Sequence, residues 1–276
     1  MILARASAPD PRLAALKARL ADFYAGNRAY YDEAEGGKDV LYEPILDFLR
    51  EQEKKLGRPV KVLEVGAGKT SFPAYLLDRC AARVVDYTAY DINATNAAFY
   101  AERGIRHLLG GWECVRAAGT FDFCFCTYVY EHVADPHIFL KNLAGILTPG
   151  GALAIVCPKY VCPGYVSPAL RWLPWWRRHA LTTFLALSNL LTWLEGKAKC
   201  WICLEPAVFQ RPYRRDYDAI HLVSTADTHA ALRQDFRVRS LPLRRSSLRM
   251  RLFDELTLLH VLAEKRSTTR RKSLPQ

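Results

Sequence analysis

Two glycines separated by a single residue follow an apolar run at residues 60–65, and this break constrains the fold more than any other feature of the chain. Such a run is typical of a buried strand. Gly66 and Gly68 lack Cβ, so their turn can adopt conformations closed to other residues and leave backbone amides accessible at the start of a helix. A second apolar run, residues 84–90, ends at Asp91, whose carboxylate is suited to accept both hydroxyls of a ribose. The two elements together predict a nucleotide-binding α/β fold.

The details of the glycine loop exclude two common nucleotide-binding motifs. A dinucleotide fingerprint has a third glycine where this chain has Ser71, and a Walker loop has four residues between its glycines. What remains is Glu-Val-Gly-Ala-Gly at residues 64–68. This stretch resembles Asp/Glu-x-Gly-x-Gly, the first motif of class I S-adenosylmethionine-dependent methyltransferases.

Further motifs continue this resemblance in the expected order. Residues 121–127 resemble the family's fourth strand, and Glu131-His132-Val133 is similar to a Glu-His-Val that many members carry after it. Leu-Thr-Pro-Gly-Gly at residues 147–151 resembles the entry to the fifth strand. Four motifs in order are far more specific than one glycine pair. The resemblance implies an enzyme that uses S-adenosyl-L-methionine; the alternative is a nucleotide-binding module of another kind or an inactive copy.

The rhythm of apolar runs predicts an α/β fold, which the resemblance specifies as Rossmann-like and doubly wound. We expect a mostly parallel seven-stranded sheet with helices on both faces and a helical, tryptophan-rich insertion after the fifth strand. Strands are expected at residues 60–65, 84–90, 105–109, 121–127, 152–157 and 218–223 and within 256–262. Helices are expected at residues 9–22, 42–55, 71–80, 94–103, 136–146 and 226–234.

These elements suggest four parts in the chain. Residues 1–56 are expected to form an N-terminal helical cap, with a tyrosine-rich connector at 24–32. The S-adenosylmethionine-binding domain is expected to comprise residues 57–157 and 216–264, interrupted by a lid or substrate region at 158–215. Residues 265–276 read as a disordered basic tail.

The resemblance implies a set of donor-binding residues, carried over position by position. Glu64, Gly66 and Gly68, with Ala67 between them, match residues that surround the methionine part of the donor, and Asp91 matches the residue that binds the ribose. Ile92 and Asn93 would lie near the adenine edge. Many members hold the adenine amine with an aspartate after the third strand, where this chain offers Trp112 or Glu113 instead. Thr127, at the end of the fourth strand, completes the set.

Histidine 132 is the candidate catalytic residue. A sulfonium methyl is already activated, so positioning can supply most of the rate and no metal ligand is expected. A hydroxyl acceptor needs a base, and His132 follows the carboxyl end of a strand and has an ordinary pKa near neutrality. The alternative is that His132 only bonds to backbone or helps to bind the donor. His221, on the expected sixth strand, is interpreted as structural.

The insertion carries the features most particular to this chain. Five of the six tryptophans lie in it, beside several arginines, and residues 180–194 have the spacing of an amphipathic helix too short to span a bilayer. One interpretation is a lid that packs over the substrate pocket, another is an interfacial helix that meets a membrane, and a third is an extra layer of core. The first two favour an apolar or amphiphilic acceptor.

Composition narrows the partners and the compartment. The first twenty residues lack an apolar signal-peptide core, and eight cysteines suggest a reducing compartment, so we expect a cytoplasmic enzyme, with contact to the inner face of the membrane as an option. The net charge of +11 is compatible with anionic lipid, nucleic acid or a phosphorylated substrate. Four cysteines were considered as zinc ligands, although buried small hydrophobes are the preferred interpretation. These are Cys157, Cys162, Cys200 and Cys203.

We therefore expect O-methylation, or less favourably N-methylation, of an amphiphilic small molecule, a lipid-linked glycan or a secondary metabolite. A nucleic-acid methyltransferase is the runner-up. It is disfavoured because the Asn/Asp/Ser-Pro-Pro-aromatic motif of base amino-group methylators is replaced by residues 127–130, Thr-Tyr-Val-Tyr. The third possibility is a non-catalytic membrane- or partner-binding protein that retains the donor fold.

Overall fold

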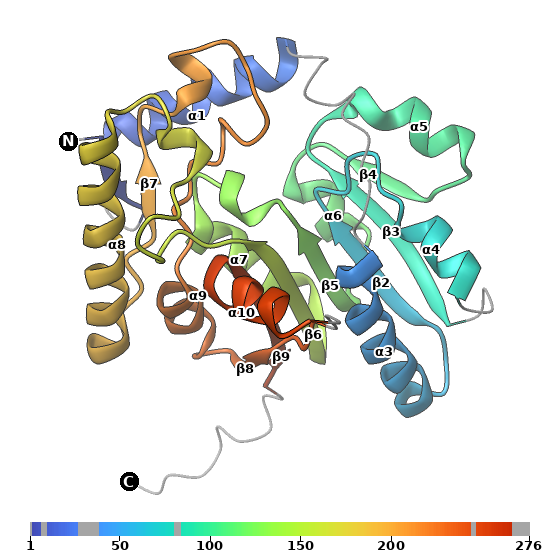
Figure 1. The fold of residues 1–276 in the computed structure, drawn as a ribbon. Helices are drawn as coiled ribbons and strands as arrows, with labels where there is room; N and C mark the ends of the chain where they lie inside the picture. Colours follow the sequence, from blue (N-terminus) through green and yellow to red (C-terminus); the bar gives the residue numbers. More distant parts are fainter. Residues whose placement is uncertain (1, 7–9, 27–38, 80–83, 244–246, 267–276) are drawn as a thin grey trace, which may run out of the picture.

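A seven-stranded sheet forms the centre of the molecule, in a computed structural model that describes residues 2–6, 10–26, 39–79, 84–243 and 247–266. The strand order is β4-β3-β2-β5-β6-β9-β8 (Figure 1). The first five strands in this order are parallel, and β9 pairs antiparallel with both β6 and β8. The strands are β2 Val60–Val65, β3 Val85–Asp91, β4 His107–Leu109, β5 Phe121–Thr127, β6 Leu147–Pro158, β8 Phe236–Ser240 and β9 Leu258–Lys265. The predicted mostly parallel sheet of seven strands is confirmed.

Helices cover both faces of the sheet. On one face α3 and α4 pack against Phe123 and Phe125 of β5, whereas the intervening Cys124 and Cys126 belong to the core under α6, α7 and α9. Successive side chains of a strand point to opposite faces, and a parallel sheet is buried on both, which explains the unbroken apolar run. These helices are α3 Asp39–Leu56, α4 Phe72–Arg79, α5 Ala97–Glu102, α6 Trp112–Ala117, α7 Pro136–Ile146, α9 Thr225–Leu232 and α10 Leu248–Thr257. Short 3-10 turns are η1 Ala94–Asn96, η2 Tyr130–His132, η3 Pro168–Leu170 and η4 Ala207–Phe209.

The expected sixth strand at residues 218–223 is wrong. This segment is irregular and makes one isolated bridge, between His221 and Ile202. Its apolar residues are buried because Ile220, Leu222 and Val223 enter three different apolar clusters. The segment is therefore apolar because it is buried, although it forms no ladder of strand hydrogen bonds. The last two strands of the sheet come from β8, which was not predicted, and from β9.

The N-terminal segment packs with the insertion rather than with the sheet. Strand β1 (Leu3–Arg5) pairs antiparallel with β7 (Trp201–Cys203) of the insertion. Helix α1 (Pro11–Gly26) buries Leu13, Leu16 and Leu20 against the same region, and α8 (Trp175–Glu195) lies at the opposite side of the molecule from α4 and α5 (Figure 1). The division into domains stays a prediction. Among the described residues, no helix is long and apolar enough to cross a bilayer.

Two expected loop regions differ or fall outside the described residues. Residues 24–26 of the expected connector belong to the end of α1, and its remaining residues, 27–32, lie outside the described part of the chain. Lys265 of the expected tail ends β9, where its Nζ donates to the carbonyls of Ala144 and Leu147 at 2.7 and 2.8 Å. Residues 267–276 lie outside the described part.

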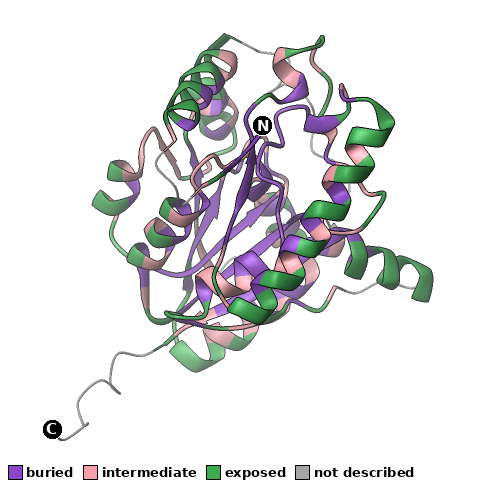
Figure 2. Ribbon diagram, turned by 90° about the vertical axis from the view of Figure 1, so that its left-hand side faces the viewer, coloured by how far each residue is buried: buried purple, intermediate pink, exposed green. Residues whose placement is uncertain are grey.

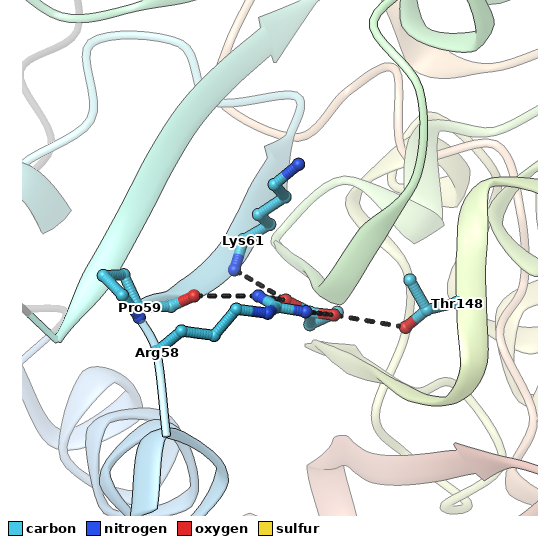
Figure 3. Close-up of polar contacts among 5 residues, drawn as sticks. Arg58, Pro59, Lys61 and Thr148 are labelled. Carbon is cyan, nitrogen blue, oxygen red and sulfur yellow. Dashed lines mark hydrogen bonds and ion pairs between the residues drawn. The ribbon is translucent and has the colours of Figure 1, made fainter. Parts of the chain in front are cut away.

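Asp122 ties three strands together at the amino end of the sheet. Its carboxylate accepts from two guanidinium nitrogens of Arg58 at 2.7 and 3.0 Å, from Lys61 N at 3.0 Å and from Thr148 Oγ1 at 3.3 Å (Figure 3). Burial would raise the pKa of Asp122, but the bonds from Arg58 and Lys61 lower it. The contacts join the starts of β2, β5 and β6, and the other ends of β2 and β5 carry the candidate site.

Candidate active site

A cavity of about 450 Å³ opens at the carboxyl ends of β2, β3 and β5. Open α/β sheets bind ligands at this edge, where the strand order changes direction. The order β3-β2-β5 reverses between β2 and β5. The cavity is lined by the loop after β2, the end of β3, the turn after β5, and parts of α1 and the insertion.

The glycine loop requires glycine at both positions. Gly66 and Gly68 have φ of +65° and +54°, in the left-handed region that L side chains rarely adopt. A Cβ on Gly66 would stand 2.5 Å from Val129 Cγ2, so the loop also packs too closely for a side chain. Both glycines line the cavity.

Asp91 lies at the cavity wall beside the glycine loop. Its Oδ2 accepts from Gly68 N and its Oδ1 from Asn93 N, both at 3.0 Å. Burial raises the pKa of Asp91, and these backbone bonds oppose that rise. The carboxylate is thereby fixed at the end of β3, in the position expected for a ribose-binding group.

Four of the predicted donor-binding residues do not line the cavity. Glu64 is buried beneath the loop and accepts from Thr70 Oγ1 at 2.8 Å and Tyr87 Oη at 2.5 Å. Ala67 is buried, Asn93 caps η1 by accepting from Thr95 N at 2.9 Å, and the Glu113 carboxylate lies over Gly111. Their roles toward a donor stay predictions; Glu64 holds the loop from below.

Ile92, Trp112 and Thr127 do line the cavity. Ile92 is 73% exposed, so its side chain is accessible to an apolar ligand in the cavity. The ring of Trp112 packs against two others, with its centroid 5.2 Å from that of Tyr90 in a tilted arrangement and 5.8 Å from that of Phe139 in an edge-to-face arrangement. Of the two residues proposed to replace the family's adenine-binding aspartate, Trp112 is therefore the one at the cavity.

Asn96 was missed by sequence reasoning. It lines the cavity near Asp91 and is buried, yet its Nδ2 has no hydrogen-bond partner among the described residues. An unpaired buried amide donor costs free energy, which makes Asn96 a candidate for ligand binding at this wall. An asparagine five residues after the acidic strand end carries no sequence signal of its own.

His132 faces the other end of the cavity and is paired with a buried carboxylate. Its Nδ1 lies 2.9 Å from Oδ2 of Asp218, and its Nε2 lies 4.0 Å from Glu131 Oε1. Burial alone would lower the pKa of His132, but Asp218 and Glu131 raise it to about 10. Burial also raises the pKa of Glu131 to about 7. The sequence suggested a histidine titrating near neutrality, whereas the pairing with Asp218 makes it a stronger base.

His221 is buried behind this pair, and its Nδ1 lies 3.0 Å from the carbonyl of Tyr130. Burial lowers the pKa of His221 to about 4. A neutral imidazole bonded to backbone fits the structural role expected for it, although it does not lie on a strand.

The insertion reaches the cavity through a loop and not through its tryptophan helix. Tyr213, Arg215 and Asp216 line the cavity, whereas no residue of α8 does. The interpretation in which the apolar face of this helix packs over the substrate pocket is therefore wrong, because that face is exposed to solvent. In the described part of the chain, no three His, Cys, Asp or Glu residues come together as metal ligands, the four cysteines considered for zinc included.

Comparison with known sequences places this geometry in a family. Residues 38–196, more than half of the chain, match the family model described as a methyltransferase domain. Ubiquinone biosynthesis O-methyltransferases are similar over shorter stretches: that of Parvibaculum lavamentivorans is 38% identical over 94 residues, 33% of this chain and 36% of that protein. That of Bradyrhizobium diazoefficiens is 30% identical over 134 residues, 42% of this chain and 49% of that protein. The chain thus matches less than half the length of these relatives.

Solved structures support the same fold. The plantazolicin methyltransferase BamL, in complex with a triazolic desmethylPZN analog and SAH, superposes with a TM-score of 0.54 at 16% identity, covering 92% of this chain and 96% of that one. The plantazolicin methyltransferase BpumL, with a pentazolic analog and SAH, gives 0.54 at 14% identity, covering 94% and 100%. With a switch-point cavity, a two-glycine loop and a matching family model, the chain belongs to the S-adenosylmethionine-dependent methyltransferases of Rossmann-like fold.

Proposed function

We propose that this methyltransferase transfers the methyl group to a hydroxyl oxygen of an amphiphilic small molecule, and that the His132–Asp218 pair takes up the hydroxyl proton. The observation that carries the proposal is the 2.9 Å contact between these two side chains at the cavity. The similarity to O-methyltransferases supports an oxygen acceptor.

The donor end has the features that S-adenosylmethionine requires. Gly66 and Gly68 bring backbone to the cavity wall, Asp91 is a fixed carboxylate for the ribose hydroxyls, and Asn96 has an amide nitrogen with no partner among the described residues. Ile92 and Trp112 provide apolar contact for the adenine. We assign these six residues to donor binding, with Thr127 near the methyl group.

Bound S-adenosylmethionine supplies an electrophilic methyl group, whose bond to sulfur breaks as the bond to the acceptor oxygen forms, leaving S-adenosylhomocysteine. The work of the protein is then to orient the acceptor and remove its proton. In our proposal the acceptor O–H bond gives its proton to the neutral form of His132, whose fraction rises as the pH approaches its pKa of about 10, so the rate of transfer should rise with pH over this range. Asp218 stabilises the resulting imidazolium, because an opposite charge in a buried site favours the charged form. Attack by the oxygen leaves a neutral ether and a protonated histidine, which loses its proton to solvent.

The proposed acceptor class follows from the cavity walls. Beyond His132 the lining includes Val133, Ile138 and Tyr213, together with Arg215. Apolar and aromatic walls with charged groups, Lys69 and Arg215 among them, suit a molecule that has both an apolar and a polar part.

Replacement of His132 by glutamine tests the role of the base. We expect transfer of tritiated methyl into the solvent-extractable fraction of a cell lysate to fall by about 10²–10⁴-fold, with S-adenosylmethionine affinity unchanged in calorimetry. Asp218→Asn should act in the same direction. A wild-type rate for His132→Gln would overturn the assignment, and nuclease-sensitive label would overturn the acceptor class.

We also propose a membrane contact through α8, because this helix has its apolar side outward. Three of its four buried positions, Thr182, Ser188 and Thr192, are polar, and the fourth is Leu185. Ser188 and Thr192 bond to Trp201 and Asp227. Figure 2, in which this side of the molecule faces the viewer, shows exposed turns along the helix. The exposed apolar residues are Trp175, Trp176, Phe184, Leu187, Leu190, Leu191, Trp193 and Leu194.

The charge beside this face favours a lipid surface over a protein partner. Arg177 and Arg178 lie in the first turn of α8 next to its exposed tryptophans, an arrangement that suits anionic headgroups and the interfacial layer. Vesicles of phosphatidylglycerol should co-sediment the protein and vesicles of phosphatidylcholine should bind it more weakly. Leu187→Glu should abolish binding, whereas Thr183→Glu, a matched charge on an exposed polar position of the same helix, should weaken it less. Equal binding by both variants would refute the contact.

A further inference from the structure

Tyr24, in the last turn of α1, bonds both to the partner of His132 and to a residue close after Asp91. Its Oη donates to Asp218 Oδ2 at 2.7 Å, and its carbonyl accepts from Asn93 Nδ2 at 3.3 Å. Tyr24 also lines the cavity. One residue therefore links the partner of His132 with the segment that follows Asp91 at the donor end.

Two donors converge on one carboxylate oxygen of Asp218. Oδ2 receives the Tyr24 hydroxyl at 2.7 Å and faces His132 Nδ1 at 2.9 Å. Asp218 is fully buried and belongs to an irregular segment, so no ladder of strand bonds fixes its side chain. Burial would raise the pKa of Asp218, and His132 and Tyr24 lower it. The orientation of this carboxylate depends on these side-chain contacts.

Helix α1 is held firmly enough to act as the support for Tyr24. Lys17 forms an ion pair with Asp135, which lies just after η2, and the Arg19 guanidinium lies 3.9 Å from the ring centroid of Phe209. Phe23 packs against Tyr213 of the insertion, with ring centroids 5.7 Å apart. The helix is thus attached to both segments that carry the His132–Asp218 pair.

We propose that Tyr24 is a positioning residue, whose hydroxyl holds Oδ2 of Asp218 and takes up part of the negative charge that this carboxylate would otherwise direct at His132. The role rests on the proposed function of His132 in transfer. The hydroxyl and the imidazolium both interact with the same carboxylate oxygen, so each stabilises part of the negative charge of Asp218. Without it, Asp218 interacts more strongly with the proton on His132, and the histidine gives up that proton less readily.

Titration of His132 tests this without any acceptor. Besides Tyr24 of α1, the groups that face this imidazole are Glu131 of its own turn and Asp216 and Asp218 of the irregular segment that follows the insertion. The NMR signal of His132, identified by its loss in His132→Gln, should titrate up to about one pH unit higher in Tyr24→Phe, as expected for one bond to a charged group. Tyr24→Phe keeps the ring and the carbonyl that binds Asn93, so donor affinity should be unchanged.

Tyr75→Phe is the matched control, because Tyr75 also donates its hydroxyl to a carboxylate, that of Glu43, but lies outside the cavity. It should leave the titration of His132 unchanged. An unshifted titration in Tyr24→Phe, or an equal shift in both variants, overturns the inference. If Tyr24→Phe is unfolded by circular dichroism, Tyr24→Leu repeats the test. A shifted titration together with full activity of His132→Gln would instead refute the proposed function and leave the positioning role in place.

Discussion

Substitution of Gly66 by alanine tests whether the glycine loop is built around a contact as well as a backbone conformation. Its φ of +65° costs an L residue about 1–2 kcal/mol. The new Cβ would stand 2.5 Å from Val129 Cγ2 and 2.9 Å from Cγ1, an overlap that costs roughly 1–3 kcal/mol to relieve. The free energy of unfolding should therefore fall by about 2–5 kcal/mol.

Gly57 provides the matched control for this prediction. It has a φ of +63°, but a Cβ there would meet no atom within 4 Å, so Gly57→Ala should lose only the backbone part, about 1–2 kcal/mol. Val129→Ala in the Gly66→Ala background removes both clashing methyl groups and should restore most of the difference. Urea unfolding followed by tryptophan fluorescence measures all three variants.

Donor binding should follow the same order. Because Gly66 lines the cavity, displacement of its loop should weaken S-adenosylmethionine binding in calorimetry by at least about tenfold, which corresponds to 1.4 kcal/mol. Gly57→Ala should bind the donor as the wild type does. Equal losses of stability in the Gly66 and Gly57 variants, or no recovery with Val129→Ala, would refute the steric reasoning.

Two further predictions concern charge. The folded state raises the pKa of His132 from 6.5 to about 10, so its contribution to stability is complete below pH 6.5 and is lost as pH rises toward 10. In urea unfolding across this range, the free energy of unfolding should fall more steeply with pH for the wild type than for His132→Gln. Parallel curves would contradict the pairing. At the amino end of the sheet, Asp122→Ala leaves Lys61 N without its acceptor and should lower the free energy of unfolding by about 2–3 kcal/mol without changing donor affinity. A loss of affinity comparable to that of Gly66→Ala would contradict the assignment of Asp122 to structure alone.

The amino-acid sequence by itself determined the elements whose cause is local. The glycine pair after residues 60–65 marked the loop because a left-handed turn requires glycine at Gly66 and Gly68 wherever the chain folds. Asp91 was found because it ends a run rich in β-branched and aromatic residues, which is typical of a strand. His132 was identified as a candidate by its place after β5, although not by its environment.

Only the tertiary structure decided the partners of these residues. Asp218 reaches His132, and Tyr24 reaches Asp218 across 194 positions of sequence, because β1 and α1 pack onto the insertion. The sequence predicted a strand at residues 218–223 for a related reason. Its apolar residues are buried in three clusters formed with distant segments, and an apolar run indicates that a segment is buried but not which segments pack against it. The pKa of His132 depends in the same way on a carboxylate that only folding brings within 2.9 Å.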